Sequence, residues 1–315
     1  MSDTAVHPID PTAAFRAARD QLLQLRTDLP RAVAEFTWPD LGQRFCWAHD
    51  WFDRIAEGND STALTIVEQD LSATSFSFAE LARRSHQVAR WLAGLGVRRG
   101  DPVLVMLGNQ IELWEVMLGV FKLGAVVLPT TTALGSADLA DRLERAEVRA
   151  IICNFGDVDK FAGLADDLLR ICTGSAPAGW QAYADSGATG DSPVPHPQTG
   201  PDDRLLLYFT SGTTDRPKLV EHSQVSYPLG HLSTLYWLGL QPGDVHLNIS
   251  APGWAKHAWS NFFSPWIAEA TVVAFNYTRL DAAALVRLLD EHDVTSLCAP
   301  PTVWRMLIKA DLGER

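Results

Sequence analysis

The stretch of this sequence with the most chemically useful side chains runs from Tyr208 to Lys218. It reads Tyr-Phe-Thr-Ser-Gly-Thr-Thr-Asp-Arg-Pro-Lys, so four hydroxyl side chains surround one glycine and a lysine follows. Hydroxyl groups and successive backbone amides donate hydrogen bonds to phosphate oxygens, glycine lets the backbone approach closely, and lysine adds positive charge. The pattern predicts a polyphosphate site, and an ordinary turn rich in serine and threonine is the alternative.

Two common phosphate-binding motifs do not describe this stretch. A P-loop needs a second glycine before its lysine and a serine or threonine after it, whereas Leu219 follows Lys218. A G-x-G-x-x-G dinucleotide motif after a strand is missing, and so is the G-x-S-x-G elbow of many hydrolases. A kinase with a P-loop and a hydrolase with a serine elbow are therefore disfavoured.

The elements that must position this stretch alternate between strands and helices. Apolar and β-branched runs predict strands at 64–67, 103–107, 125–128, 148–152, 204–209, 245–249, 270–275 and 295–298. Helical spacing and capping residues predict helices at 11–28, from Ser77 to Gly94, and at 111–123, 136–147, 223–237, 255–267, 281–292 and 302–310. Single helices between strands imply an α/β fold with two βα-alternating, mostly parallel sheet portions packed together.

The chain divides by composition into four regions. Residues 1–50 are expected to form a helical extension rich in tryptophan, and 51–172 a first α/β subdomain. Residues 173–202, rich in small and polar residues, are expected to form a surface connection, and 203–315 a second α/β subdomain. The loop after Phe209 would then lie at the carboxyl end of a strand, where α/β sheets present ligands.

Composition narrows the class of protein. The 315 residues carry 26 Lys and Arg against 38 Asp and Glu, a net charge of −12, which argues against a nucleic-acid binder. A hydrophobic content of 47% excludes global disorder. Four widely spaced cysteines, no secretory signal and no apolar run of membrane-spanning length together predict a soluble cytoplasmic protein.

The stretch from Tyr208 to Lys218 resembles the signature loop of the AMP-forming adenylating enzymes, which include acyl-CoA synthetases. Their pattern is [YF]-T-S-G-[ST]-[ST]-G-x-P-K, and this sequence departs from it only where Asp215 stands for glycine. Residues 76–81, 100–107 and 121–129 are similar to further segments of that family. Residues 252–257 and 299–307 most resemble the medium-chain acyl-CoA synthetase branch.

The resemblance implies that a carboxylate attacks the α-phosphate of ATP to give an acyl-adenylate and pyrophosphate, after which a thiol, usually coenzyme A, takes the acyl group. The carboxylic acid would be a fatty or an aromatic one. By the same resemblance the residues that hold the β- and γ-phosphates are Thr210, Ser211, Gly212, Thr213, Thr214 and Lys218. They would stabilise the leaving pyrophosphate by hydrogen bonds and charge.

The resemblance also points to three residues that could line the acyl pocket. Trp254 matches an aromatic position beside the reacting carboxylate, with a core or edge tryptophan as the alternative. His257 follows by one helical turn and could face the same cleft, or could be an ordinary hydrogen-bonded histidine. Trp304 could wall the far end of the pocket, or belong to the core.

The family's remaining parts are expected outside this chain. They are an adenine-binding loop, a glutamate for Mg²⁺, an aspartate for the ribose and a C-terminal domain with a catalytic lysine. We therefore expect no catalytic residue and no metal ligand here, and interpret the chain as the incomplete N-terminal part of a synthetase of fatty acid metabolism, inactive alone. The alternative is a non-catalytic nucleotide- or acyl-binding regulatory protein that keeps a truncated synthetase fold.

Overall fold

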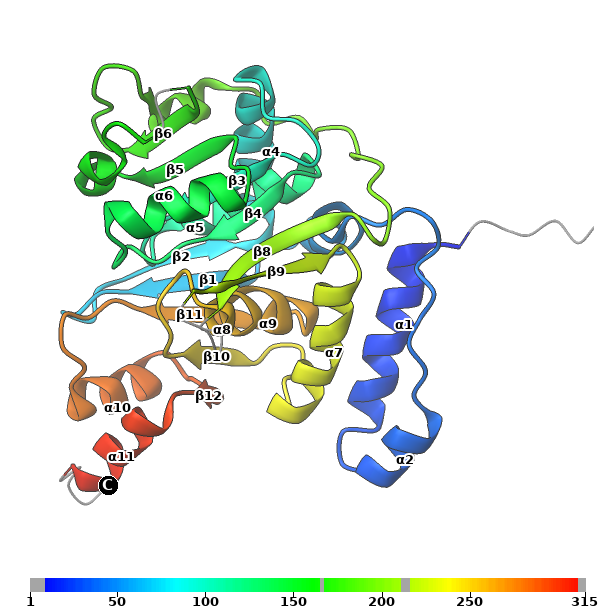
Figure 1. Ribbon diagram of the computed structural model, residues 1–315. Helices are drawn as coiled ribbons and strands as arrows, with labels where there is room; N and C mark the ends of the chain where they lie inside the picture. The colour runs from blue at the N-terminus through cyan, green and yellow to red at the C-terminus, as the bar shows by residue number, and fades with distance from the viewer. Residues whose placement is uncertain (1–8, 165–166, 211–215, 311–315) are drawn as a thin grey trace, which may run out of the picture.

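The computed structural model describes residues 9–164, 167–210 and 216–310, whose strands form two sheets (Figure 1). The five-stranded sheet has the order β12 (Ser296–Cys298), β10 (Val245–Asn248), β11 (Thr271–Phe275), β1 (Thr62–Val67), β2 (Ala73–Ser77). The seven-stranded sheet has the order β7 (Gln181–Ala182), β6 (Leu169–Thr173), β5 (Ala150–Asn154), β3 (Pro102–Met106), β4 (Val126–Pro129), β8 (Arg204–Thr210), β9 (Lys218–Ser223).

Helices connect the strands and cover both sheets. The α-helices are α1 (Pro11–Gln24), α2 (Leu29–Glu35), α3 (Asp53–Ala56), α4 (Phe78–Gly94), α5 (Ile111–Lys122), α6 (Ser136–Arg145), α7 (Ser226–Leu238), α8 (Ala255–Ala258), α9 (Ser264–Ile267), α10 (Ala282–Glu291) and α11 (Pro301–Lys309). Shorter turns are π-helical at η1 (Ala48–Phe52) and η4 (Trp259–Phe263), and 3₁₀ at η2 (Phe155–Phe161) and η3 (Tyr183–Ala188). The capping box expected at Ser77 begins α4, with Glu80 as its second member.

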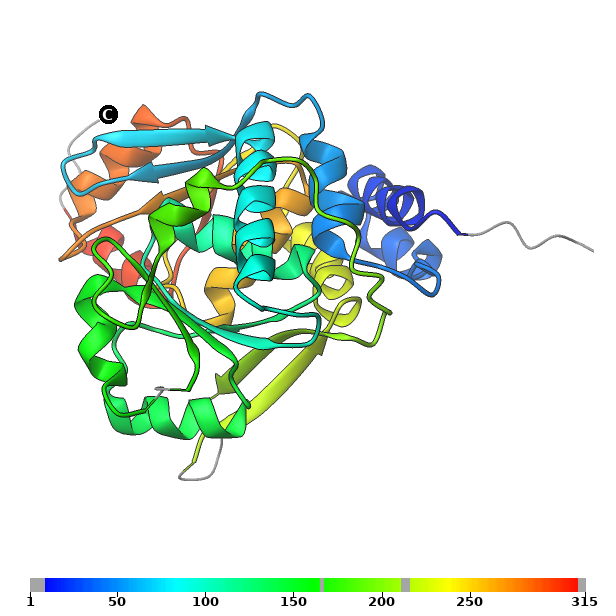
Figure 2. The same ribbon diagram turned by 90° about the horizontal axis from the view of Figure 1, so that it is seen from above.

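The elements stack in layers, seen from two directions in Figures 1 and 2. The largest core lies between the sheets and joins α4, α5 and α9 to β1 and β11 on one side and to β3 and β4 on the other. A second core packs α6 on the opposite face of the seven-stranded sheet. A third packs α10 and α11 on the outer face of the five-stranded sheet. The predicted α/β class, with two mostly parallel sheets packed together, is confirmed.

Each sheet takes strands from both halves of the chain. In the five-stranded sheet β1 pairs with β11, and in the seven-stranded sheet β4 pairs with β8, both in parallel. The predicted regions 51–172 and 203–315 therefore do not correspond to one sheet each. Antiparallel pairing occurs between β1 and β2 and between β8 and β9, at one edge of each sheet.

Residues 173–202 supply an edge strand and buried side chains in addition to crossing the surface. They supply the edge strand β7, and the Tyr183 hydroxyl donates a 2.5 Å hydrogen bond to the buried carboxylate of Glu115 on α5. Thr199 is fully buried and bonds to the backbone of Phe45. Among the described residues, no helix has the length and apolar character that a membrane span requires.

Candidate functional site

The predicted phosphate-binding residues begin and end at the tip of one hairpin. Strands β8 and β9 are antiparallel, and their register sets Thr210 directly opposite Lys218. Both residues are exposed. The other predicted residues, Ser211, Gly212, Thr213 and Thr214, lie outside the described residues, as does Asp215.

Thr210 and Lys218 share one face of the hairpin. Side chains alternate between faces along a strand, and directly paired residues of antiparallel strands point the same way. Tyr208 belongs to the core between the sheets, whereas Phe209 and Leu219 pack into the core beneath α6. Thr210 and Lys218 are therefore on the same face as Tyr208. Burial holds the pKa of the Tyr208 hydroxyl well above its ordinary value, so this side chain beneath the hairpin tip stays neutral.

The segment with Trp254 reaches the same edge of the seven-stranded sheet. Gly253 has a φ of +89°, and a Cβ there would lie 2.2 Å from the backbone nitrogen of Thr131. Thr131 comes just after the carboxyl end of β4, and β4 is the parallel neighbour of β8. The carboxyl ends of parallel neighbours meet at one edge, so this glycine segment and the hairpin tip share that edge.

Trp254 and His257 differ in their exposure. Trp254 precedes α8 and leaves 60% of its surface exposed, so it is not a core tryptophan. His257 is 3% exposed, and its Nε2 donates to the side-chain oxygen of Asn109 at 3.0 Å. Burial lowers the pKa of His257 to about 3, so the ring is neutral at physiological pH. The geometry of His257 fits the alternative of a buried, hydrogen-bonded histidine.

Trp304 lies on α11, where Val303 provides the buried contact, and it is 44% exposed. Its place at the far end of an acyl pocket stays a prediction. Sequence reasoning missed Asn109 and Thr131, which follow the buried strands β3 and β4 and contact the 253–257 segment. The signal available in the sequence was a polar residue two or three positions after each apolar run.

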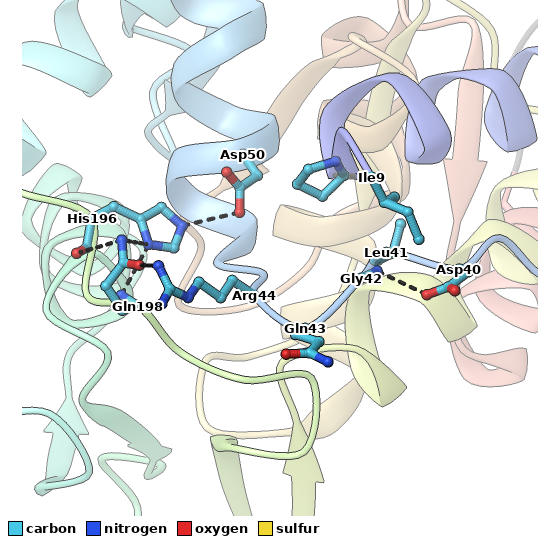
Figure 3. Close-up of a pocket in the computed structure, with 10 residues that line it drawn as sticks. Ile9, Asp40, Leu41, Gly42, Gln43, Arg44, Asp50, His196 and Gln198 are labelled. Carbon is cyan, nitrogen blue, oxygen red and sulfur yellow. Dashed lines mark hydrogen bonds and ion pairs between the residues drawn. The ribbon is translucent and has the colours of Figure 1, made fainter. Parts of the chain in front are cut away.

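A spacious cavity of about 860 Å³ lies elsewhere, between the N-terminal extension and the 196–198 segment (Figure 3). There His196 points toward Asp50, and its Nε2 lies 3.1 Å from a carboxylate oxygen of Asp50. The predicted site residues do not line this cavity. We interpret its polar contacts as links between the extension and the connection of residues 173–202.

A buried ion pair close to that cavity accounts for the lysine in the apolar segment 121–129. Lys122 is fully buried, and its Nζ lies 2.6 Å from the Asp53 carboxylate, which His49 and His86 also contact. Burial alone would raise the pKa of Asp53, but the hydrogen bonds from both histidines and the charge of Lys122 hold it well below its usual range. Lys122 is therefore a structural cation that ties α5 to α3.

Comparisons with known proteins identify the family of this chain. A family model described as AMP-binding enzyme matches residues 52–315. The chain is 34% identical over 282 residues to 4-hydroxybutyrate–CoA ligase 1 of Metallosphaera sedula, covering 86% of this chain and 49% of that protein. It is 30% identical to the mitochondrial acyl-coenzyme A synthetase ACSM3 of Homo sapiens, covering 83% of this chain and 46% of that protein.

Solved structures share the fold. An acyl-CoA synthetase from Brucella canis gives a TM-score of 0.77 at 24% identity, over 92% of this chain and 53% of that one. Acetoacetyl-CoA synthetase from Streptomyces lividans gives 0.76 at 25% identity, over 86% and 45%. The chain thus spans about half the length of the curated relatives it matches. On the family match and the level of identity, this chain belongs to the AMP-binding enzyme family of acyl-CoA synthetases, and corresponds to their N-terminal part.

Proposed function

We propose that the protein containing this chain activates a carboxylic acid with ATP and transfers the acyl group to coenzyme A. In this proposal the tip of the β8–β9 hairpin holds the β- and γ-phosphates, through Ser211, Gly212, Thr213 and Thr214 together with the described Thr210 and Lys218. The acid would lie beside Trp254. Relatives named as 4-hydroxybutyrate–CoA ligase and acyl-coenzyme A synthetase support the class of reaction.

The observation that carries the proposal is the register of the hairpin. It sets an exposed hydroxyl opposite an exposed ammonium group, on one face, at the ligand-presenting edge of a mostly parallel sheet. When carboxylate attack breaks the bond between the α- and β-phosphates, negative charge grows on the departing pyrophosphate. Fixed donors and a lysine at that position stabilise the charge without any covalent chemistry by the protein.

A buried, neutral His257 beside the proposed acid site adds no charge there. The acid would therefore meet an exposed tryptophan face and backbone groups in this half of the site. Among the three candidates for the pocket, Trp254 has the position and the exposure to contact a substrate. We propose a fatty or aromatic acid, because an aromatic wall suits an apolar group.

The described residues of the hairpin tip, Thr210 and Lys218, supply no carboxylate for the Mg²⁺ ion that the family resemblance implies. Magnesium prefers carboxylate, phosphate and water oxygens, whereas Thr210 and Lys218 offer a hydroxyl and an ammonium group. We therefore derive no step through a metal here. We propose the cytoplasm as the compartment, since the described cysteines are free thiols, including the register neighbours Cys153 and Cys172.

The proposal is tested by measuring pyrophosphate release from ATP by the complete natural protein across a panel of aliphatic, hydroxylated and aromatic acids. We expect release that requires one class of acid and that becomes continuous when coenzyme A is supplied. ATP binding without acid-dependent release from any member of the panel would contradict the proposal and favour a regulatory nucleotide-binding protein.

The 315-residue chain alone provides a second test. We expect it to bind ATP weakly and to form no acyl-adenylate, because the resemblance assigns the adenine, ribose and lysine contacts to other segments. Turnover on the order of 1–10 per second by this chain would show that the catalytic groups are misassigned.

A further inference from the structure

Helix α6 lies behind the β8–β9 hairpin, on the face opposite Thr210 and Lys218. Its buried residues Leu139 and Leu143 belong to the core into which Phe209 and Leu219 pack. Phe209 directly precedes Thr210, and Leu219 directly follows Lys218. The helix therefore shares a core with one residue of each strand, and each of these two residues adjoins a predicted phosphate-binding residue.

Two arginines of α6 cover the ring of Phe209. The guanidinium carbons of Arg142 and Arg145 lie 5.0 Å and 4.9 Å from the ring centroid. Cations at this distance over an aromatic face are attracted to it, so the two arginines hold β8 from behind. Burial lowers the pKa of Arg142, as expected for a guanidinium half enclosed between helix and ring.

Asp141 makes the matching contact to the other strand. The Nε of Arg216, two residues before Lys218, donates to Asp141 Oδ1 at 2.9 Å, and a second nitrogen of the same guanidinium also contacts that carboxylate. Arg145 donates to the other oxygen of Asp141 at 2.9 Å. One carboxylate thus connects the arginine that covers Phe209 with the arginine that leads into β9.

We propose that Asp141 is a positioning residue for the hairpin tip, acting through Arg216 to fix Lys218 opposite Thr210, and that polyphosphate binding depends on this contact. The inference rests on the proposed function of the tip. Asp141 works from the far face of the sheet and does not touch the ligand. A carboxylate beside the phosphates would oppose their binding, so its benefit must come from position.

Loss of charge should act differently at two acidic residues of the same helix. Asp141→Asn removes a negative charge and with it the ion pair to Arg216, whereas Asp138→Asn removes the same charge at an exposed position one turn earlier. If only the charge mattered, both variants would bind polyphosphate as well as or better than the parent. If the contact matters, Asp141→Asn binds more weakly and Asp138→Asn does not.

The first measurement is the KM for ATP of the complete natural protein in the pyrophosphate-release assay. We expect Asp141→Asn to raise the KM for ATP about threefold to fivefold, as loss of one exposed ion pair would, with the KM for the acid unchanged. Asp141→Glu, which keeps the carboxylate, should have a KM for ATP close to that of the parent. A KM for ATP in Asp141→Asn equal to that in Asp138→Asn, or an equal rise in both KM values, would overturn the inference.

The second measurement is amide hydrogen exchange of this chain, which requires no activity. Asp141→Asn should accelerate exchange in peptides that cover β8 and β9, while Asp138→Asn and the parent remain alike. Equal exchange in all three proteins would overturn the inference even if the enzyme is active. Absence of acid-dependent pyrophosphate release by the parent would instead count against the proposed function, and the exchange data would still decide the role of Asp141.

Discussion

The two sides of the candidate site are held by different forces. On the side of the proposed acid, Gly253 packs its backbone against Thr131 with no room for a side chain, and the neighbouring His257 is buried. On the phosphate side, the hairpin tip is held by Arg216, whose side chain is 70% exposed, and by Asp141. Close packing fixes the first segment, whereas the second depends in addition on charge in contact with water.

The two sides should therefore respond differently to substitutions and to solution conditions. Packing against backbone is insensitive to salt and intolerant of added atoms, because interiors are dense and relax only partly. Exposed ion pairs contribute little to global stability and weaken with salt, yet they can set local position. We therefore expect the acid side to control folding and the phosphate side to control binding.

The largest effect is expected from Gly253→Ala. The new Cβ would collide with the backbone of Thr131 and would also require a φ of +89° from a non-glycine residue. We expect a loss of more than about 3 kcal/mol in the free energy of unfolding, measured by urea denaturation. Gly243→Ala is the matched control, since its φ is +85° but its surroundings are open, and about 1 kcal/mol is expected there. Equal losses in both variants would show that packing at Gly253 is unimportant.

The next effect concerns pH. His257 has a pKa of about 3 in the folded chain, while an unfolded histidine titrates near 6.5. Between these values the unfolded chain binds a proton that the folded chain does not, so stability falls as the pH decreases. From pH 6.5 to 4.5, His257 should account for about 2.3 kcal/mol of that fall in the free energy of unfolding, which His257→Gln would remove.

The phosphate side should not respond in the same pH range. Hydrogen bonding from Arg145, opposed by slight desolvation and aided by Arg216, lowers the pKa of Asp141, so its ion pairs are lost only in stronger acid. The difference in stability between the parent and Asp141→Asn should therefore be the same at pH 6.5 and 4.5. A difference that grows over this range would contradict the contrast between the two sides.

Salt should affect the phosphate side and not the acid side, which is the reverse of the response to pH. Raising the salt from 0.05 M to about 1 M shortens the screening length from more than 10 Å to about 3 Å. Amide exchange in peptides covering β8 and β9 should accelerate about twofold to threefold, and exchange in the 252–257 segment should not change. Equal acceleration in both segments would indicate general loosening of the fold.

The smallest effect is expected from Asp215→Gly, at the one departure from the signature pattern. Aspartate adopts the positive φ that glycine allows more readily than most residues do, so we expect the KM for ATP to fall by less than tenfold. Arg216, the nearest cation in sequence, contacts Asp141 on α6. A tenfold or larger fall in KM that salt reduces would show that Asp215 faces the phosphates.

Much of the fold could be predicted because its strands are buried on both faces and therefore appear as apolar runs, as in 103–107. The missed strands β2, β6 and β7 lack that signal, and in β6 Arg170 interrupts the apolar residues. Strand β2 is largely exposed, and β7 has two residues, so pairing with a neighbour and not sequence pattern defines them. The helix expected at 255–267 is divided by a π-helical turn with a kink at Asn261, which no local propensity indicates.

The site was predictable only where its residues are contiguous. Thr210 and Lys218 belong to one local pattern, and antiparallel pairing brings them together. The contacts of Gly253 with Thr131, His257 with Asn109, and Asp141 with Arg216 join residues more than 70 positions apart. Such pairs depend on how the strands are ordered in the sheet, which this sequence alone did not specify.

The most direct test of the account is the KM for ATP of Lys218→Ala in acid-dependent pyrophosphate release, with the exposed lysine variant Lys309→Ala as control. Loss of a charge-assisted hydrogen bond to phosphate is expected to raise the KM for ATP about tenfold or more, with the KM for the acid unchanged. Lys309→Ala should match the parent. A KM for ATP that is the same in Lys218→Ala as in the parent would contradict the assignment of the hairpin tip as the phosphate site.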